Sequence, residues 1–176
     1  MASTLPFEIN GHLIRAGKAK DCETLHKLVM ELAKYEKAPE QVETTPEQLR
    51  EDGFGANPRY ELLVAEDLNS GIVRGIALYY PIYSTWKGPV LYLEDLIVTE
   101  SARGSKLGYA LMLGLAQVAA EKGVEDLRWQ VLDWNEPARR FYQQLDAKID
   151  TTWDNCRLRK PELRKLTEQL SNLIGA

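Results

Sequence analysis

Cysteine and histidine are scarce in this chain of 176 residues, which contains two of each. Cys22 and Cys156 lie far apart and form no CxxC spacing, so we expect neither a disulfide scaffold nor a zinc site. His12 and His26 are too few for a histidine-rich metal site, and they do not form an HExxH motif. The chemistry expected of this chain therefore uses no metal.

Positive charge and long apolar runs are also in short supply. The net charge is -4, so the composition does not indicate nucleic acid or an anionic membrane as a partner. No apolar segment approaches the ~20 residues that span a bilayer, and residues 1–15 do not read as a secretion signal. We therefore expect a cytoplasmic protein that binds neither nucleic acid nor membrane.

The residues that are present suit a globular protein, because 44% are hydrophobic and 27% are charged. We expect a single domain over 1–176, with an N-terminal extension at 1–10 and a C-terminal helix at 161–176. The element order β-α-α-β-β-β-α-β-α-β-α predicts a mixed α/β domain around one central sheet. Strands are expected at 12–17, 60–66, 72–83, 90–98, 127–134 and after Cys156, and helices after Asp21, after Thr45, from Leu107, over 136–145 and at the C-terminus.

Capping residues mark the predicted helix boundaries. Asp21 is the expected N-cap of the first helix. Thr45 as N-cap and Gln48 at the third helical position form a capping box for the second helix. Gly123 is expected to end the long apolar helix that starts at Leu107.

The segment VLYLEDLIV at 90–98 places two adjacent acids, Glu94 and Asp95, in an otherwise apolar strand. Burying carboxylates in such a strand is unfavourable by several kcal/mol unless something compensates them. Strand alternation sends neighbouring side chains to opposite faces. We therefore expect only one of the two acids to face a ligand.

Glycines and basic residues follow this strand directly, in the turn TESARGSKLGY before the long helix. A helix N-terminus has free N–H groups and a positive dipole end, and glycines let the backbone approach an anion closely. The turn matches neither the Walker A loop nor the dinucleotide motif GxGxxG. Its spacing fits a phosphate-binding loop, and it fits equally well a plain β–α turn with incidental basic residues.

Two motifs together resemble a known family. The turn is similar to the R/Q-x-x-G-x-G/A acetyl-CoA loop of the GCN5-related N-acetyltransferases (GNAT), and VLDWNEPARRFY is similar to their second signature. The likeness covers residues 12–160. The segments ELAKYEKAPEQV, EDGFGANPRY, YSTWKG and YLEDL resemble the diamine (spermidine/spermine) N-acetyltransferases, and YSTWKG and VLDWN resemble the thialysine-acetylating branch. The resemblance implies a single-domain GNAT fold with a mixed, mostly antiparallel sheet flanked by helices, acetyl-CoA as co-substrate, a small cationic amine as substrate and a homodimer.

The resemblance also assigns residues to the cofactor. The backbone of 96–98 would hold the pantetheine arm, 103–109 the pyrophosphate, and 135–138 the rest of the CoA. Backbone amides at such a strand edge can also polarise the thioester carbonyl. These residues are Leu96, Ile97, Val98, Arg103, Gly104, Ser105, Lys106, Leu107, Gly108, Tyr109, Asn135, Glu136, Pro137 and Ala138.

Two residues are candidates for proton transfer. The amine arrives as an ammonium with a pKa of about 10 and must lose a proton, and a carboxylate shielded by an apolar strand makes a better base. By resemblance Glu94 is the general base, acting directly or through a water, while Asp95 is assigned mainly to structure. Tyr142 is the general acid for the departing thiolate. The alternatives are that Glu94 caps a backbone or pairs with an arginine, and that Phe141 and Tyr142 are both core aromatics.

The amine itself would be held by acids and aromatics. By resemblance Tyr35 and Glu36 line its site together with Glu94, while Trp86 offers an aromatic face for a cation. Asp154 could neutralise a distal ammonium. Each of these residues, taken alone, also fits an ordinary surface position.

The sequence departs from the family pattern at several positions. Lys106 stands where the acetyl-CoA loop has its first glycine, and Asp146 stands where a glycine precedes Ala147. Cys156 occupies the place of a tryptophan near the substrate, with Trp153 as the alternative for that role. Ser84 replaces an acid that polyamine-specific members carry, which favours a shorter diamine or an amino-acid-like amine.

Two other functions stay open on the sequence. One is acetylation of a protein lysine or a peptide N-terminus. The other is a CoA-binding protein with impaired catalysis. This alternative stays open because Lys106 and Asp146 depart from the family pattern.

Overall fold

The computed structural model describes residues 5–174 and confirms the mixed α/β architecture, with a six-stranded sheet that is mostly antiparallel. The short 3₁₀ helices are η1 (Ala19–Asp21), η2 (Pro39–Gln41) and η3 (Glu100–Ala102). The main elements are β1 (Phe7–Ile9), β2 (His12–Ala16), α1 (Cys22–Tyr35), α2 (Pro46–Phe54), β3 (Glu61–Asp67), β4 (Val73–Ser84), β5 (Gly88–Val98), α3 (Leu107–Glu121), β6 (Leu127–Arg128), α4 (Glu136–Gln143) and α5 (Lys160–Ile174).

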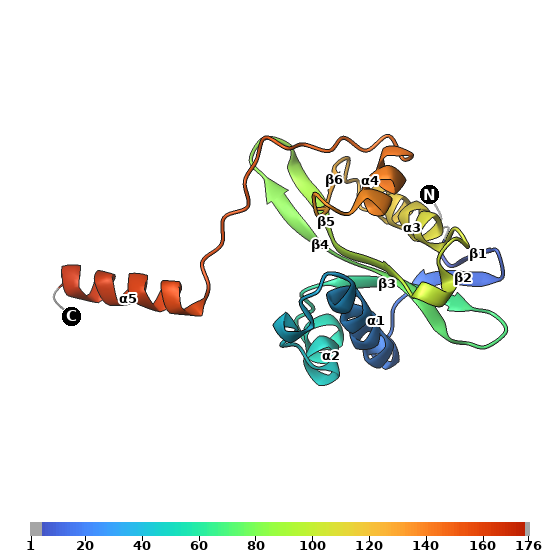
Figure 1. Cartoon of the computed structure of the whole chain (residues 1–176), viewed down its shortest axis with the longest axis horizontal. Helices are drawn as coiled ribbons and strands as arrows, with labels where there is room; N and C mark the ends of the chain where they lie inside the picture. The colour runs from blue at the N-terminus through green and yellow to red at the C-terminus, as the bar shows by residue number, and fades with distance from the viewer. Residues whose placement is uncertain (1–4, 175–176) are drawn as a thin grey trace. The chain divides into compact units, whose positions relative to one another are not determined.

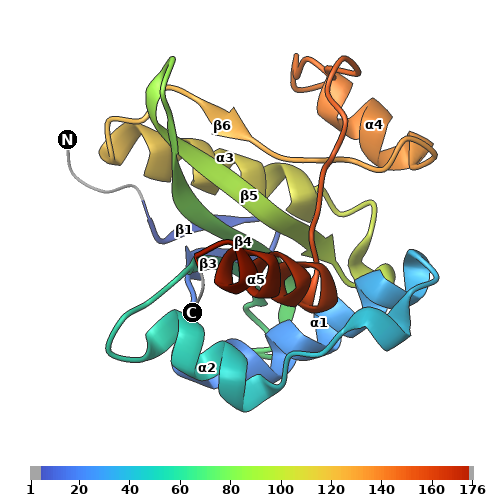
Figure 2. The ribbon, with the colours of Figure 1, turned by 90° about the vertical axis from the view of Figure 1, so that its left-hand side faces the viewer.

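The strands lie in the sheet in their order along the chain, from β1 to β6. Neighbours from β1 to β5 are antiparallel, and β6 pairs with β5 in parallel through Leu91 and Leu127. Helices α1 and α2 cover one face of the sheet and α3 covers the other (Figures 1 and 2). The described chain forms two compact units that divide between Gln130 and Val131, so the sheet and α1–α3 belong to the first unit, and α4 and α5 to the second.

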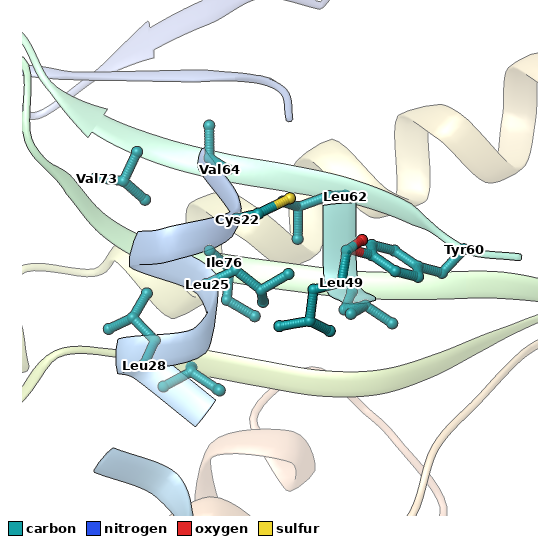
Figure 3. Close-up of a cluster of buried hydrophobic side chains, with 11 residues drawn as sticks. Cys22, Leu25, Leu28, Leu49, Tyr60, Leu62, Val64, Val73 and Ile76 are labelled. Carbon is teal, nitrogen blue, oxygen red and sulfur yellow. The ribbon is translucent and has the colours of Figure 1, made fainter. Parts of the chain in front are cut away.

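Apolar side chains from α1, α2 and the central strands meet on one face of the sheet (Figure 3). Cys22, Leu25 and Leu28 come from α1, and they are joined by Leu49 of α2. The Tyr60 hydroxyl donates a 2.6 Å hydrogen bond to the carbonyl oxygen of Leu49, so this buried phenol has a polar partner. Burying these side chains is the main driving force for docking the two helices onto the sheet.

The structure confirms two of the predicted helix boundaries. At the start of α2, Thr45 accepts a 3.2 Å hydrogen bond from the backbone N–H of Gln48. At the end of α3, Gly123 follows the C-cap with φ 65°, the left-handed conformation that suits glycine. Among the described residues, no helix is long and apolar enough to cross a membrane.

The prediction for Asp21 is corrected. It occupies the N-cap position of α1, but its carboxylate makes no capping bond there. Instead it accepts bonds of 2.8 and 3.0 Å from Arg15 and one of 2.8 Å from the backbone N–H of Lys18. Arg15 also pairs with Glu66 of β3. Burial alone would raise the pKa of Asp21, but the bonds from Arg15 and Lys18 outweigh it and hold that pKa below its usual range.

Three strand predictions also change. β1 was missed, although Asn10 and Gly11 have φ values of 50° and 73° and form the Asn-Gly type of hairpin turn that the sequence signals. β1 lies within the segment 1–10, which was expected to be an N-terminal extension. Residues 1–4 of that segment fall outside the described residues. β6 covers two residues rather than 127–134. No strand forms after Cys156 within the described chain, where residues 155–159 have no regular structure before α5.

Candidate active site

A β-bulge in β5 lies at the pair of acids. Leu78 of β4 pairs with Asp95, whereas the next residue, Tyr79, pairs with Leu93. Glu94 is therefore the extra residue on β5, and the simple alternation expected of a strand does not hold there. Bulges of this kind re-aim side chains and are common beside active sites.

The bulge brings both acids to the face covered by α1 and α2, which corrects the prediction of opposite faces. Asp95 lies opposite Leu78, which belongs to the buried cluster on that face. Tyr80 packs against the same cluster, and its hydroxyl donates a 2.7 Å hydrogen bond to Oε2 of Glu94. The ring of Tyr80 also lies 5.4 Å from the ring of Tyr92, its partner on β5.

The shielding expected for Glu94 is found instead at Asp95. Glu94 is exposed and Asp95 is half-buried. Burial, together with the nearby carboxylates of Glu94 and Glu36, raises the pKa of Asp95 to about 6. Burial also raises the pKa of Glu36, which follows directly after α1. No cation or hydrogen-bond donor within residues 5–174 pairs with the Asp95 carboxylate, so a cationic ligand would find uncompensated negative charge here.

The loop between β5 and α3 has the backbone geometry of an anion-binding turn. Gly104 has φ 81°, and Lys106, the N-cap of α3, has φ 66° and ψ 15°. No side chain caps this helix, and its first turn carries no acid. The first N–H groups of a helix have no partner within it, so those of Leu107, Gly108 and Tyr109 can bind an anion. This arrangement fits the pyrophosphate of a CoA molecule.

Arg103 connects this loop to the end of α1. Its guanidinium lies 5.5 Å from the centroid of the Tyr35 ring, and its Nε donates a 3.4 Å bond to the carbonyl oxygen of Val98. The Thr99 hydroxyl lies 3.1 and 3.0 Å from the two carboxylate oxygens of Glu31 on α1. A residue predicted for the cofactor and one predicted for the amine therefore lie in contact.

Trp86 lies in the turn between β4 and β5 and is 86% exposed. Ser84 accepts 3.3 Å hydrogen bonds from the backbone N–H groups of Trp86 and Lys87, so this serine closes the turn. Within the part of the chain that the structure describes, Trp86 forms no hydrogen bond or ring contact with Glu94. Its predicted part in cation binding stays a prediction.

The second unit carries the remaining candidates. Asn135 caps α4 by accepting a 3.3 Å bond from the Ala138 N–H, with Glu136 and Pro137 in the first turn. Tyr142 is buried, and its ring lies 5.2 Å from that of Phe141. Asp146 has φ 59°, which explains why glycine suits this position. Asp154, Trp153 and Cys156 are exposed.

Tyr80 contacts Glu94 through its hydroxyl, and sequence reasoning missed this residue. The run IALYYPIY does contain a signal, because Ile76, Leu78 and Tyr80 alternate onto the face of α1. The bulge that places Glu94 beside Tyr80 depends on pairing between two strands, and no local pattern reveals it.

Several known proteins resemble this chain in sequence or in fold. The profile of the Acetyltransferase (GNAT) family matches residues 21–147. The thialysine N-epsilon-acetyltransferase of Bos taurus is 44% identical over 142 residues, covering 77% of this chain and 84% of that protein. The thialysine N-epsilon-acetyltransferase of Sus scrofa is 40% identical over 163 residues, covering 88% and 96%. An integron cassette protein of V. cholerae has a similar fold, with TM-score 0.74 at 24% identity over 90% of this chain and 98% of that one.

Proposed function

The chain belongs to the GNAT acetyltransferase family, in its diamine and thialysine N-acetyltransferase branch, and on this premise we propose that it transfers an acetyl group from acetyl-CoA to the primary amine of a small diamine, polyamine or thialysine-like amino acid. One observation carries the acceptor class: two carboxylates gather at the bulge of β5, and no cation of the described chain pairs with Asp95. Such a place suits an ammonium.

Glu94 is proposed as the general base. Its Oε2 is bonded to Tyr80, and its exposed position leaves the carboxylate accessible to an amine or to a bridging water. The proton leaves the ammonium nitrogen for the carboxylate, and the nitrogen lone pair becomes free to attack. Glu36 and Asp95 would hold the positive charge of the substrate as it approaches, with Tyr35 and Trp86 as aromatic neighbours and Asp154 for a distal ammonium.

Acetyl-CoA supplies the acetyl group as a reactive thioester. The backbone of Leu96–Val98 and the loop Arg103–Tyr109 are proposed to hold the co-substrate, supported by the uncapped N-terminus of α3. By resemblance, Asn135–Ala138 also bind it. Tyr142 is proposed to give its hydroxyl proton to the departing sulfur, a role supported by the family match alone.

We propose an amino-acid-like amine or a short diamine as the acceptor rather than a long polyamine. Ser84 closes the β4–β5 turn at the place where polyamine-specific members carry an acid, so one cation-binding group is missing there. Two relatives named for thialysine acetylation support the same choice. We further propose that the chain acts as one N-acetyltransferase domain, as a homodimer and in the cytoplasm.

An acetylation screen tests this function. Purified protein and acetyl-CoA are incubated with thialysine, ornithine, putrescine, spermidine, spermine and a lysine peptide, and acetylated product is measured by mass spectrometry. We expect thialysine or a short diamine to give the highest kcat/KM. Turnover of the lysine peptide alone would contradict the small-amine proposal. If acetyl-CoA does not bind at ~1 mM, its binding free energy is weaker than about -4 kcal/mol. That result would contradict the proposal that the chain is an acetyl-CoA-dependent enzyme.

Tyr142→Phe tests the proposed acid. We expect kcat to fall about a hundredfold with little change in acetyl-CoA affinity, because only the proton donor is removed. Tyr83→Phe, at an exposed tyrosine of β4, is the matched control and should retain full activity. Unchanged turnover of Tyr142→Phe would remove this residue from the reaction.

A further inference from the structure

Within residues 5–174, Tyr80 is the one hydrogen-bond partner of the Glu94 side chain. Its hydroxyl donates to Oε2 over 2.7 Å, a short distance typical of bonds to a charged acceptor. Glu94 is the extra residue of the bulge, so regular strand pairing does not set the direction of its side chain. The bond to Tyr80 supplies the missing constraint.

The Tyr80 ring is itself firmly held. It packs against the buried cluster beneath α1 and α2, and its backbone pairs with Tyr92 in the β4–β5 ladder. Burial and the bond to Glu94 raise the pKa of Tyr80 above its ordinary value, so the hydroxyl stays protonated and acts as a donor at neutral pH.

We propose that Tyr80 is the positioning residue for Glu94 in the proposed amine acetylation, on which this inference rests. Tyr80 fixes Oε2, which leaves Oε1 to accept the proton. In that step one N–H bond of the ammonium breaks, an O–H bond forms at Oε1, and the electron pair stays on nitrogen. The carboxylate is then a carboxylic acid and the amine is neutral.

The neighbouring tyrosines supply matched controls. Tyr92 lies beside Tyr80 on the same face. Its hydroxyl forms no hydrogen bond within residues 5–174. Tyr79 precedes Tyr80 and contacts Glu61 through its hydroxyl at 3.3 Å. Neither of these two phenols reaches Glu94 by a hydrogen bond.

Several titratable groups surround this pair. Tyr80 comes from β4, Tyr92 and Asp95 come from β5, and Glu36 at the end of α1 acts on Asp95. Burial, Glu94 and Glu36 raise the pKa of Asp95 to about 6, so this carboxyl also titrates within the pH range of the test. A comparison of Tyr80→Phe with Tyr92→Phe cancels this contribution, because both variants retain Asp95 and Glu36.

The test is kcat/KM for the best amine against pH in wild type, Tyr80→Phe and Tyr92→Phe. We expect Tyr80→Phe to lose about tenfold in kcat/KM through a lower kcat, because the carboxylate has lost the donor that orients it. The KM for acetyl-CoA should not change. Tyr92→Phe should match wild type. An unchanged kcat/KM in Tyr80→Phe, or equal losses in both variants, overturns the inference.

A second measurement does not need activity. The pKa of Tyr80 is followed by NMR of the ring carbon that bears the hydroxyl, in wild type and in Glu94→Gln. We expect the pKa of Tyr80 to fall in the variant, because the neutral amide no longer favours the protonated phenol, while Tyr79 serves as an unchanged internal reference. An unchanged Tyr80 overturns the inference. A wild type that acetylates no amine contradicts the proposed function instead, so the two failures are distinguishable.

Discussion

Two groups of acids within the first unit have opposite environments. Asp21 and Glu66 both face Arg15, whose guanidinium bonds to each of them. Glu94 and Asp95 gather with Glu36 on the face covered by α1 and α2, and no cation of the described chain pairs with Asp95. The first group shares a guanidinium of the protein, whereas the second keeps its negative charges close together without a bound cation.

The pKa directions follow this difference. Asp21 is more buried than Asp95, yet the bonds from Arg15 and Lys18 overcome the effect of burial and lower its pKa. Asp95 has no such partner, so burial, Glu94 and Glu36 all act together and raise its pKa to about 6. The first arrangement stabilises the fold. The second destabilises it at neutral pH, which is typical of a site that binds a ligand of opposite charge.

Removing Arg15, the cation of the first group, should have the largest effect on the free energy of unfolding. Arg15→Met leaves Asp21 and Glu66 as unpaired carboxylates, and we expect a loss of about 3–5 kcal/mol in the free energy of unfolding. Urea unfolding monitored by circular dichroism measures it. Arg59→Met is the control, because its side chain is 80% exposed beside Asp52 and should lose less than about 1 kcal/mol. Equal losses in the two variants would contradict the assignment of Arg15.

Removing Glu94 from the second group should affect activity rather than folding. We expect Glu94→Gln to lower kcat/KM about a hundredfold, or ~2.7 kcal/mol, and to flatten the rise of rate with pH. Amine acetylation against pH is the measurement. Glu61→Gln removes an exposed acid that pairs with Lys122 and should retain full activity. An unaltered pH profile for Glu94→Gln would place the base elsewhere.

Asp95→Asn should stabilise the protein at neutral pH. An acid whose folded pKa is raised from 3.8 to about 6 contributes stability that is present below its unfolded pKa and lost as the pH rises through the folded pKa. Two pKa units correspond to ~3 kcal/mol, so we expect a gain of about 1–3 kcal/mol at pH 7–8 and none near pH 3.5. Urea midpoints from pH 3.5 to 8 test this, and a constant difference across that range would contradict it.

The smallest effect is expected in the loop after β5. Lys106→Gly removes a side chain from a left-handed backbone position, so we expect a gain of at most about 1 kcal/mol in unfolding free energy. Acetyl-CoA affinity, measured by calorimetry, should fall a few fold because a cation is lost at the helix N-terminus. Lys37→Gly, with φ 60° outside this loop, should gain similar stability without altering the affinity. Tighter binding by Lys106→Gly would mean that the lysine crowds the ligand.

Local patterns in the sequence determined much of this protein. The helix predicted after Asp21, the Thr45 cap of α2 and the glycine after α3 are confirmed by the structure, because helix formation depends on neighbours three or four residues apart. The loop after β5 and the segment VLDWNEPARRFY were enough to identify the family.

Tertiary structure decided how the acids are used. Asp21 is predicted to be a helix cap, but Arg15 of the preceding strand β2 binds its carboxylate, and the pairing of β2 with β3 brings Glu66 to the same guanidinium. Glu94 and Asp95 are predicted to lie on opposite faces, but the pairing of β5 with β4 inserts a bulge that places both on the face of Tyr80, where Glu36 acts on Asp95. The sequence determined which charges are present. The pairing of strands distant along the chain decided that Glu66 shares Arg15 and that both acids of β5 lie on one face, because strand pairing is a non-local interaction.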